Sequence, residues 1–470
     1  QLAQQKRQEA ESLLGFMVGD FADKLRSVKR MDLLDGISNK ALEYFTNQVE
    51  EPSSLFNFSS QQAEFKSRFQ YAQTLEAMGE VAYSRGKTLE AFTAFENARI
   101  RLEALLKIQP NNLELLTLAG ANAFWLGQLH YDKSEYVAAE PLLKKYHMYS
   151  ETMYSLAPND FNSIMELSYS HNSLGSLYTN LFNYNEAKTS FTLSLELKNK
   201  ALELKPNNKN LLRDRADTIS WLAKTEENLG NFNTALTMLE STSNELNNLL
   251  AKYPSDASLL TDLANTSIQQ SYLLSYFSNK QRAFKKAQQA TNIINKSRQQ
   301  DPLNNYFQRT YYRSLAHQLM LSGHANVDRI LEETINFVQV QDFDNIEIVK
   351  IQVSLIYYFL EINLIPKAQE LLNTLENNDN YQKEIRKNKI ESRLLLTRLN
   401  LIKAKLATNK EIRIKLCEQA ISTMSEIKKT TQSVKIIYPL VQAYICLNKE
   451  SEISEIKASL VKLGITNFAL

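Results

Sequence analysis

The sequence predicts an all-α protein, built as a superhelical solenoid of antiparallel helical hairpins. Five prolines recur every 48 residues, each after a helix-like run and before residues that can begin a new helix: Pro110, Pro158, Pro206, Pro254 and Pro302. Five alanines follow the same period: Ala91, Ala139, Ala187, Ala235 and Ala283. A fixed period of this kind is the signature of repeat architectures, so we expect one stack of similar elements rather than several unrelated domains.

The composition agrees with a folded helical chain and excludes several classes of protein. Of 470 residues, 43% are hydrophobic and 23% charged, and the 11 glycines are too few for a loop-rich enzyme. The 54 Lys and Arg residues nearly balance the 52 Asp and Glu residues, so no overall field attracts nucleic acid or an anionic membrane. No apolar run approaches the roughly 20 residues of a membrane-spanning helix, and no membrane insertion within this chain is expected.

Two local features qualify this composition. The stretch from Tyr381 to Thr430 holds 13 basic and 5 acidic residues, which we interpret as solvated helix faces; contact with nucleic acid or lipid is the alternative. Only Cys417 and Cys446 occur, which excludes a disulfide framework and a metal site built from four cysteines. A single disulfide bridge between the two cysteines stays open.

Each 48-residue period is predicted to contain two helices. Apolar and aromatic residues recur at the spacing of one helix face from Ile164 to Leu181, and again from Tyr184 to Leu195. Proline cannot continue a helix and disfavours α conformation in the residue before it, so it ends the second helix. The residues after the proline offer side-chain oxygens that can cap the next helix: Asp160, Asn207, Asn208 and Asp256.

The predicted organisation has four parts. Residues 1–50 form a lead-in helical pair, and residues 51–62, which contain "PSSLFNFSSQQ", form a loop. Residues 63–302 hold five long hairpins with the 48-residue period. Residues 303–470 contain shorter, diverged hairpins and a C-terminal cap, because the period fails after Pro302 while helical patterns continue. Since Gln1 is not a natural first residue, we expect a processed product or a fragment.

Three of the periods resemble the tetratricopeptide repeat, whose pattern is W-x2-L-G-x2-Y, then A-x3-F, then P within about 34 residues. The segment "HNSLGSLY", residues 171–178, followed by "AKTSF", residues 187–191, reproduces this spacing. Two further periods match at Met78, Gly79, Ala82, Leu126, Gly127, His130 and Ala139. The resemblance implies a right-handed superhelix. The longer period adds about two turns to each helix, which should then be roughly 30 to 35 Å long.

The segment from Ala10 to Phe45 resembles a lead-in of bacterial multidomain proteins, in which a tetratricopeptide region follows a signalling module. The likeness rests on the order "AE-x-L-x-x-F-M", "D-L-L-D" and "AL-x-Y". The resemblance implies an upstream signalling module, such as a kinase or a DNA-binding domain, without indicating which, and in many such proteins a single membrane span lies just before the segment. It therefore leaves open whether this chain is cytoplasmic or extracytoplasmic. An ordinary amphipathic capping hairpin is the alternative interpretation.

No motif for catalysis or cofactor binding is present. The chain lacks a G-x-G-x-x-G sequence, a Walker-type loop and H-E-x-x-H. His130 and His171 fall where the related repeats place large packing residues, so we expect both to be half-buried. His317 and His324 could share a helix face, but no third metal ligand is near them in sequence. The sequence therefore predicts no enzymatic activity, no cofactor and no metal.

In related repeats, partners lie along a concave wall formed by the first helices. The matched motif implies that the following residues lie on this wall: Glu80, Tyr83, Phe124, Gln128, Tyr131, Asn172, Thr179, Asn180, Lys224, Asn228, Tyr272 and Tyr276. Asparagine can bond both main-chain groups of an extended peptide, and tyrosine adds contact area at low entropy cost. Packing between neighbouring helices is the alternative role for each.

We therefore expect a non-catalytic scaffold that binds a protein or an extended peptide, or a sensor region of a bacterial signalling protein. A regulatory subunit that docks on a separate enzyme or membrane complex is the alternative. Nucleic acid is not an expected partner, because the net charge is only +2.

Overall fold

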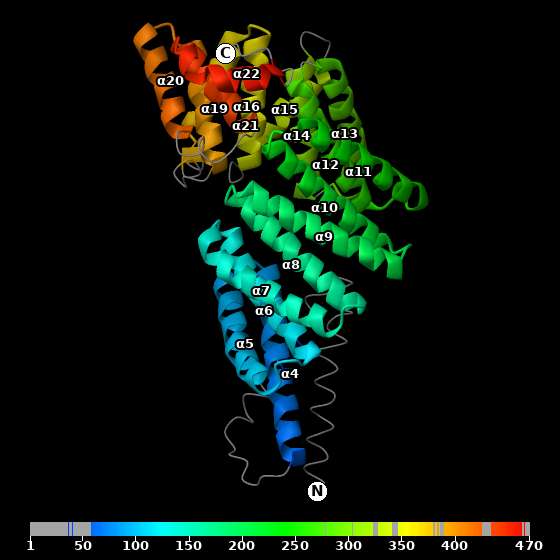
Figure 1. Cartoon of the computed structure of the whole chain (residues 1–470). Helices are drawn as coiled ribbons and strands as arrows, with labels where there is room; N and C mark the ends of the chain where they lie inside the picture. Colours follow the sequence, from blue (N-terminus) through cyan, green and yellow to red (C-terminus); the bar gives the residue numbers. More distant parts are fainter. Residues whose placement is uncertain are drawn as a thin grey trace. The chain divides into compact units, whose positions relative to one another are not determined.

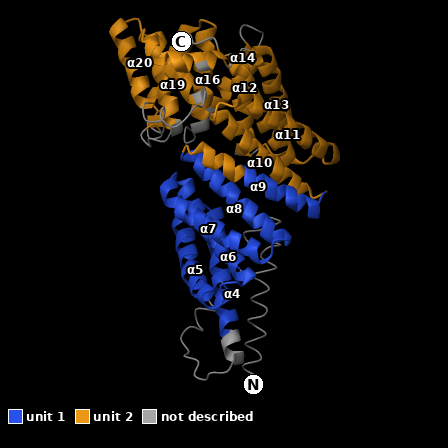
Figure 2. Ribbon diagram, viewed as in Figure 1, with its two compact units in different colours: residues 1–181, 192–206 blue, residues 182–191, 207–470 orange. Residues whose placement is uncertain are grey.

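The structure, a computed structural model, describes residues 58–277, 279–302, 304–322, 328–340, 346–378, 390–424 and 434–462, together with residues 36, 40, 381, 382, 385 and 465 (Figure 1). It divides into two compact units (Figure 2). Unit 1 comprises residues 1–181 and 192–206, and unit 2 comprises residues 182–191 and 207–470. The predicted lead-in from Ala10 to Phe45 lies outside the described residues apart from Gly36 and Lys40.

Unit 1 consists of consecutive helices that pack in antiparallel pairs. Its helices are α4 (Phe58–Ser84), α5 (Thr88–Ile108), α6 (Leu113–Asp132), α7 (Tyr136–Leu156), α8 (Phe161–Asn180) and the second part of α9 (Tyr184–Leu204). From α6 to α9 each helix has 20 or 21 residues and is therefore about 30 Å long. The core is formed between the pairs by side chains such as Phe69, Leu102, Leu115 and Tyr146.

Unit 2 continues the same pattern with hairpins that become shorter along the chain. Its helices after α9 are α10 (Lys209–Asn228), α11 (Phe232–Lys252), α12 (Ala257–Tyr276), α13 (Lys280–Gln300), α14 (Asn305–Ser322), α15 (Asp328–Val340), α16 (Ile346–Glu361), α17 (Ile365–Glu376), α19 (Ile390–Leu406), α20 (Lys410–Met424), α21 (Val434–Cys446), η2 (Glu450–Ile453) and α22 (Ser454–Lys462). No strand occurs among the described residues. The predicted all-α solenoid of antiparallel hairpins is confirmed.

A side-chain cap fixes the beginning of each first helix from α6 to α14. The oxygen of an Asn or Asp accepts a hydrogen bond from the backbone N–H three residues later, at distances between 2.9 and 3.3 Å. The capping residues, again 48 apart, are Asn112, Asp160, Asn208, Asp256 and Asn304. Each satisfies an N–H group that the helix itself leaves without an acceptor. Asn207 precedes the cap and does not serve as one.

The turn inside the first four regular hairpins contains a left-handed residue on the same period. Gly86, Ser134, Phe182 and Gly230 have φ between 62° and 84°. Around Gly86, its own N–H bonds to Tyr83 O and the next N–H, of Lys87, bonds to Ala82 O, which is the Schellman motif. Glycine adopts this conformation without strain, whereas a bulky residue such as Phe182 is destabilised there by about 1 to 2 kcal/mol. The Phe182 ring packs against Met424, Ile436 and Leu440 of unit 2, which offsets that strain.

Small residues mark the helix contacts, as the period predicts. All five alanines of the 48-residue series are fully buried. The five prolines lie in the connections between consecutive hairpins. At Gly127 in α6 a Cβ atom would lie 2.8 Å from Leu143 Cδ2 in α7, so only glycine allows this helix pair its observed distance.

One predicted boundary differs in the structure. Helix α4 begins at Phe58, inside the predicted loop 51–62, because Gln61 and Gln62 are good helix formers that extend it toward its start. The division at residues 50, 62 and 302 otherwise stays a prediction.

The C-terminal elements of unit 2 pack against its first helices. Val441 of α21, Ile453 of η2 and Leu460 of α22 share one hydrophobic cluster with Ala223 of α10 and Leu273 of α12. The two cysteines, whose pairing the sequence left open, form a disulfide between α20 and α21 with a Cα–Cα distance of 6.3 Å. This bridge ties α21 to the hairpin before it.

Substituting Gly127 with Ala should lower the free energy of unfolding by about 1 to 2 kcal/mol, although alanine favours helix by about 1 kcal/mol. The reason is that the buried Leu143 would have to move. Gly120→Ala in the same helix is the matched control, because its Cβ would meet Tyr146 Cδ2 at 3.3 Å, a contact that a small shift relieves. Urea unfolding followed by circular dichroism measures both; equal losses would contradict the role given to Gly127.

Removing the disulfide should destabilise the C-terminal hairpins by about 3 to 4 kcal/mol, since Cys417 and Cys446 close a loop across a sequence separation of 29. Thermal unfolding of the Cys417→Ala/Cys446→Ala variant measures this loss. Wild type in reducing agent is the control, because it loses the bridge without losing side-chain volume. If the variant and the reduced wild type both unfold at the same temperature as the oxidised wild type, the bridge contributes nothing to stability.

Candidate functional site

The first helices of unit 1 are joined by polar bonds between residues 49 positions apart, one more than the period. The Tyr83 hydroxyl of α4 donates to Asp132 Oδ2 of α6 at 2.7 Å, and Gln128 Nε2 donates to Asp132 Oδ1 at 2.7 Å. Asn180 Nδ2 of α8 donates to the Tyr131 hydroxyl of α6 at 2.6 Å. Several residues predicted to bind a partner are therefore bonded to the next hairpin of their own chain.

Tyr83 and Tyr131 stay neutral at physiological pH. Burial first, and then the hydrogen bond and charge of Asp132, raises the pKa of Tyr83 to about 12. Burial is also the largest cause that raises the pKa of Tyr131 to about 12. Both hydroxyls thus keep their proton and act as uncharged hydrogen-bonding groups.

The remaining predicted residues of unit 1 are half-buried. Phe124 lies against Tyr146 of α7 with ring centroids 5.7 Å apart. Asn172 Oδ1 accepts from Ser194 Oγ at 3.3 Å, and the Thr179 hydroxyl donates to Gly175 O at 2.8 Å. Glu80 is half-buried on α4. The polar side chains of this wall are therefore hydrogen-bonded within the chain, and Phe124 packs beside them.

In unit 2 the predicted residues lie on α10 and α12. Lys224 Nζ forms an ion pair with Glu227 Oε2 at 2.7 Å, and Asn228 is buried. Tyr272 of α12 packs on His317 of α14, with ring centroids 4.0 Å apart. Tyr276, one turn further along α12, packs on the hydrophobic cluster that includes α21 and α22.

Tyr276 is part of a larger group that brings five helices together. We call this group the tyrosine–arginine cluster; its members are Tyr272, Tyr276, His317, Tyr357, Arg398 and Tyr438, from α12, α14, α16, α19 and α21. Burial raises the pKa of Tyr276 well above its usual range, the charge on Glu227 raises it further, and Arg398 lowers it. Burial also raises the pKa of Tyr357 to about 12, and Arg398 again acts in the opposite direction.

The cluster offers aromatic faces, neutral hydroxyl groups and one guanidinium. A guanidinium stacks on aromatic rings and donates hydrogen bonds in a fixed planar geometry. Such a set suits the recognition of a protein segment, because Tyr and Arg are enriched among residues that dominate binding energy.

Sequence reasoning missed Tyr357, Arg398 and Tyr438, because the repeat register is lost after Pro302. One signal could have found Tyr357: it stands eleven residues before the buried Ala368, as Tyr272 stands eleven residues before Ala283. Aligning later hairpins by the alanine of the second helix would have placed it. Nothing comparable marks Arg398.

The histidines contact aromatic or acidic neighbours. His147 and His171 lie with ring centroids 4.5 Å apart, and His130 Nδ1 is 2.7 Å from Glu135 Oε2. His317 is buried against Tyr272, whereas His324 lies outside the described residues. In the part of the chain that the structure describes, no three His, Cys, Asp or Glu side chains could hold a metal ion, and no helix is long and apolar enough to cross a membrane.

A family model of the tetratricopeptide repeat matches residues 168–208, which cover the second part of α8 and all of α9. That match includes the motif of the third hairpin, and the same caps and turns recur in the neighbouring hairpins. The chain is a tetratricopeptide-type repeat protein. Its fold is that of a protein-interaction scaffold, a class that is typically non-catalytic.

Solved structures give a distant likeness, and no curated protein sequence matches the chain. The apo form of the quorum sensor NprR from B. thuringiensis is 15% identical, with 85% of this chain and 99% of that chain covered and a TM-score of 0.45. A Rap protein complexed with Competence and Sporulation Factor is 11% identical, with coverage of 95% and 99% and a TM-score of 0.44. A tetratricopeptide repeat protein from Parabacteroides merdae is 14% identical, with coverage of 69% and 98% and a TM-score of 0.38.

Protonation of His171 should destabilise unit 1 in weak acid. Burial, and secondly His147, lowers the pKa of His171 to about 4, whereas an unfolded histidine titrates near about 6.5. Between these values the unfolded chain binds the proton first, so stability falls as the pH falls from about 6.5 to about 4. In His171→Gln this pH dependence should be smaller, as measured by thermal unfolding at several pH values; an unchanged slope would contradict the assignment.

Proposed function

We propose that the chain is the binding region of a bacterial signalling protein, and that its tyrosine–arginine cluster receives a segment of a partner protein. The observation that supports this is the convergence of four tyrosines and one arginine from separate hairpins of unit 2. Residues so far apart in sequence meet only in the folded array.

The proposed binding mode uses a few aromatic anchors. A partner side chain that packs on the ring of Tyr272 would be partly desolvated, and interfaces concentrate their binding energy in a few desolvated contacts of this kind. The predicted wall of unit 1 is the second candidate surface, since Tyr131 and Asn180 present a bonded pair there. A regulatory subunit docked on a separate enzyme would use the same surfaces, and the identity of the captured partner distinguishes the two roles.

Substituting Tyr272 with Ala should weaken partner binding by about 1 to 2 kcal/mol. The partner is first captured with the wild-type chain and identified, and then titrated by calorimetry against purified variants. Tyr253→Ala is the control, because Tyr253 is an exposed tyrosine in the connection after α11. Tyr131→Ala tests the wall of unit 1. Loss only in Tyr131→Ala would move the site to unit 1, and unchanged affinity in both would refute the proposal.

A further inference from the structure

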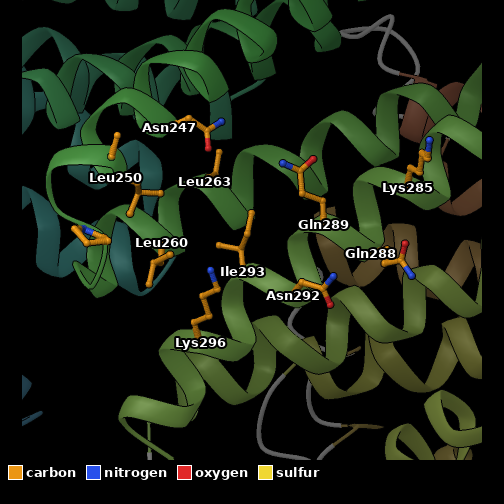
Figure 3. Close-up of a pocket in the computed structure, with 12 residues that line it drawn as sticks. Asn247, Leu250, Leu260, Leu263, Lys285, Gln288, Gln289, Asn292, Ile293 and Lys296 are labelled. Atoms are coloured by element: carbon orange, nitrogen blue, oxygen red, sulfur yellow. The ribbon is translucent and has the colours of Figure 1, made fainter.

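A groove on the second helices of unit 2 lies outside the tyrosine–arginine cluster. It has a volume of about 610 Å³ and is bounded by α11 and α13 (Figure 3). Leu260 and Leu263 of α12 lie at its floor together with Ile293 of α13. Its size is that of ordinary ligand sites, which measure about 300 to 1,000 Å³.

One helix face supplies most of the polar lining. Lys285, Gln289, Asn292 and Lys296 follow one another at spacings of four, three and four residues, which places them in a row along α13. Figure 3 shows the two lysines at opposite ends of this row. The row is about 16 Å long at 1.5 Å per residue, and all four side chains are exposed.

The charged side chains that line the groove are all positive. None of its lining residues carries a carboxylate. The acidic residues of the neighbouring helices are instead engaged elsewhere: Asp256 with Lys209, Asp262 with Arg213, Glu245 with Arg215, and Glu240 with Arg282. A ligand that complements the groove therefore carries negative charge at two points.

The amides decide between an extended and a helical ligand. Gln288, Gln289 and Asn292 line the groove, and each amide can donate to and accept from a peptide main chain; the amide of Asn247, also in the lining, donates to Ser243 O at 2.7 Å. A helical ligand satisfies its main-chain groups internally, so it would offer the amides of the groove no main-chain partners. An extended segment exposes its N–H and C=O groups and can bond to it.

From these observations we infer that the α11–α13 groove binds an extended acidic peptide segment of a partner protein, with an apolar residue between two carboxylates. In an extended chain, side chains at positions one, three and five point to the same side. Carboxylates at positions one and five lie about 13 Å apart at 3.3 Å per residue, within reach of the long side chains of Lys285 and Lys296. The apolar residue at position three then faces Leu260, Leu263 and Ile293.

The test uses the full chain and a defined probe, the fluorophore-labelled peptide Glu-Ser-Leu-Ser-Glu with blocked ends, followed by fluorescence anisotropy. The probe should bind, and Lys285→Glu/Lys296→Glu should weaken binding by about fivefold or more. Lys107→Glu/Lys133→Glu, two exposed lysines of unit 1, changes the net charge equally and should alter affinity by less than about twofold. Gln289→Ala/Asn292→Ala should fall between these values.

Two further peptides separate the inference from non-specific charge attraction. Lys-Ser-Leu-Ser-Lys should not bind, and Glu-Ser-Ser-Ser-Glu should bind more weakly than the probe because it lacks the apolar contact. The inference is overturned if the probe does not bind, if the two double-lysine variants lose affinity equally, or if the peptide without leucine binds as well. The groove shares no residue with the tyrosine–arginine cluster. Failure of the probe to bind would therefore overturn this inference without bearing on the proposed function.

Discussion

The whole array depends on a constraint at the ends of its helices: backbone groups that a helix leaves unsatisfied must find partners at a fixed period. An Asn or Asp oxygen satisfies N–H groups at the start of α6, α8, α10 and α12, and a left-handed residue follows the end of α6, α8 and α10. Helices α6, α8, α10 and α12 all have 20 residues, and equivalent residues of these neighbouring hairpins come into register. The bonds from Tyr83 to Asp132 and from Asn180 to Tyr131 follow from that register.

How much the sequence predicts depends on whether a feature repeats. The caps, the prolines and the buried alanines recur at equal spacing, so local chemistry is sufficient to place them. The period also places Phe182 at the left-handed position of its turn, but its contacts with Met424 and Leu440, far along the chain, could not be foreseen from local sequence. Arg398 meets Tyr276 for the same kind of reason. The α11–α13 groove depends on the packing of α11, α12 and α13, which the residue pattern does not predict.

The two surfaces proposed for binding differ in their physics. In the tyrosine–arginine cluster, burial raises the pKa of Tyr276, Tyr357 and Tyr438, so the cluster's contribution to binding comes from desolvated rings and one guanidinium. The groove is open, lined by exposed amides and lysines, and its attraction for a ligand is screened by salt. A chain that carries both can hold one partner by shape and another by charge.

The disulfide between Cys417 and Cys446 has a consequence for the integrity of the chain. A protease that cuts any peptide bond between these two residues produces two fragments that stay covalently linked through sulfur. The last helices, which share the hydrophobic cluster with α10 and α12, would therefore stay attached after such a cut. Under oxidising conditions the backbone between α20 and α21 can be severed without dissociating the C-terminal segment; under reducing conditions only noncovalent packing would retain it.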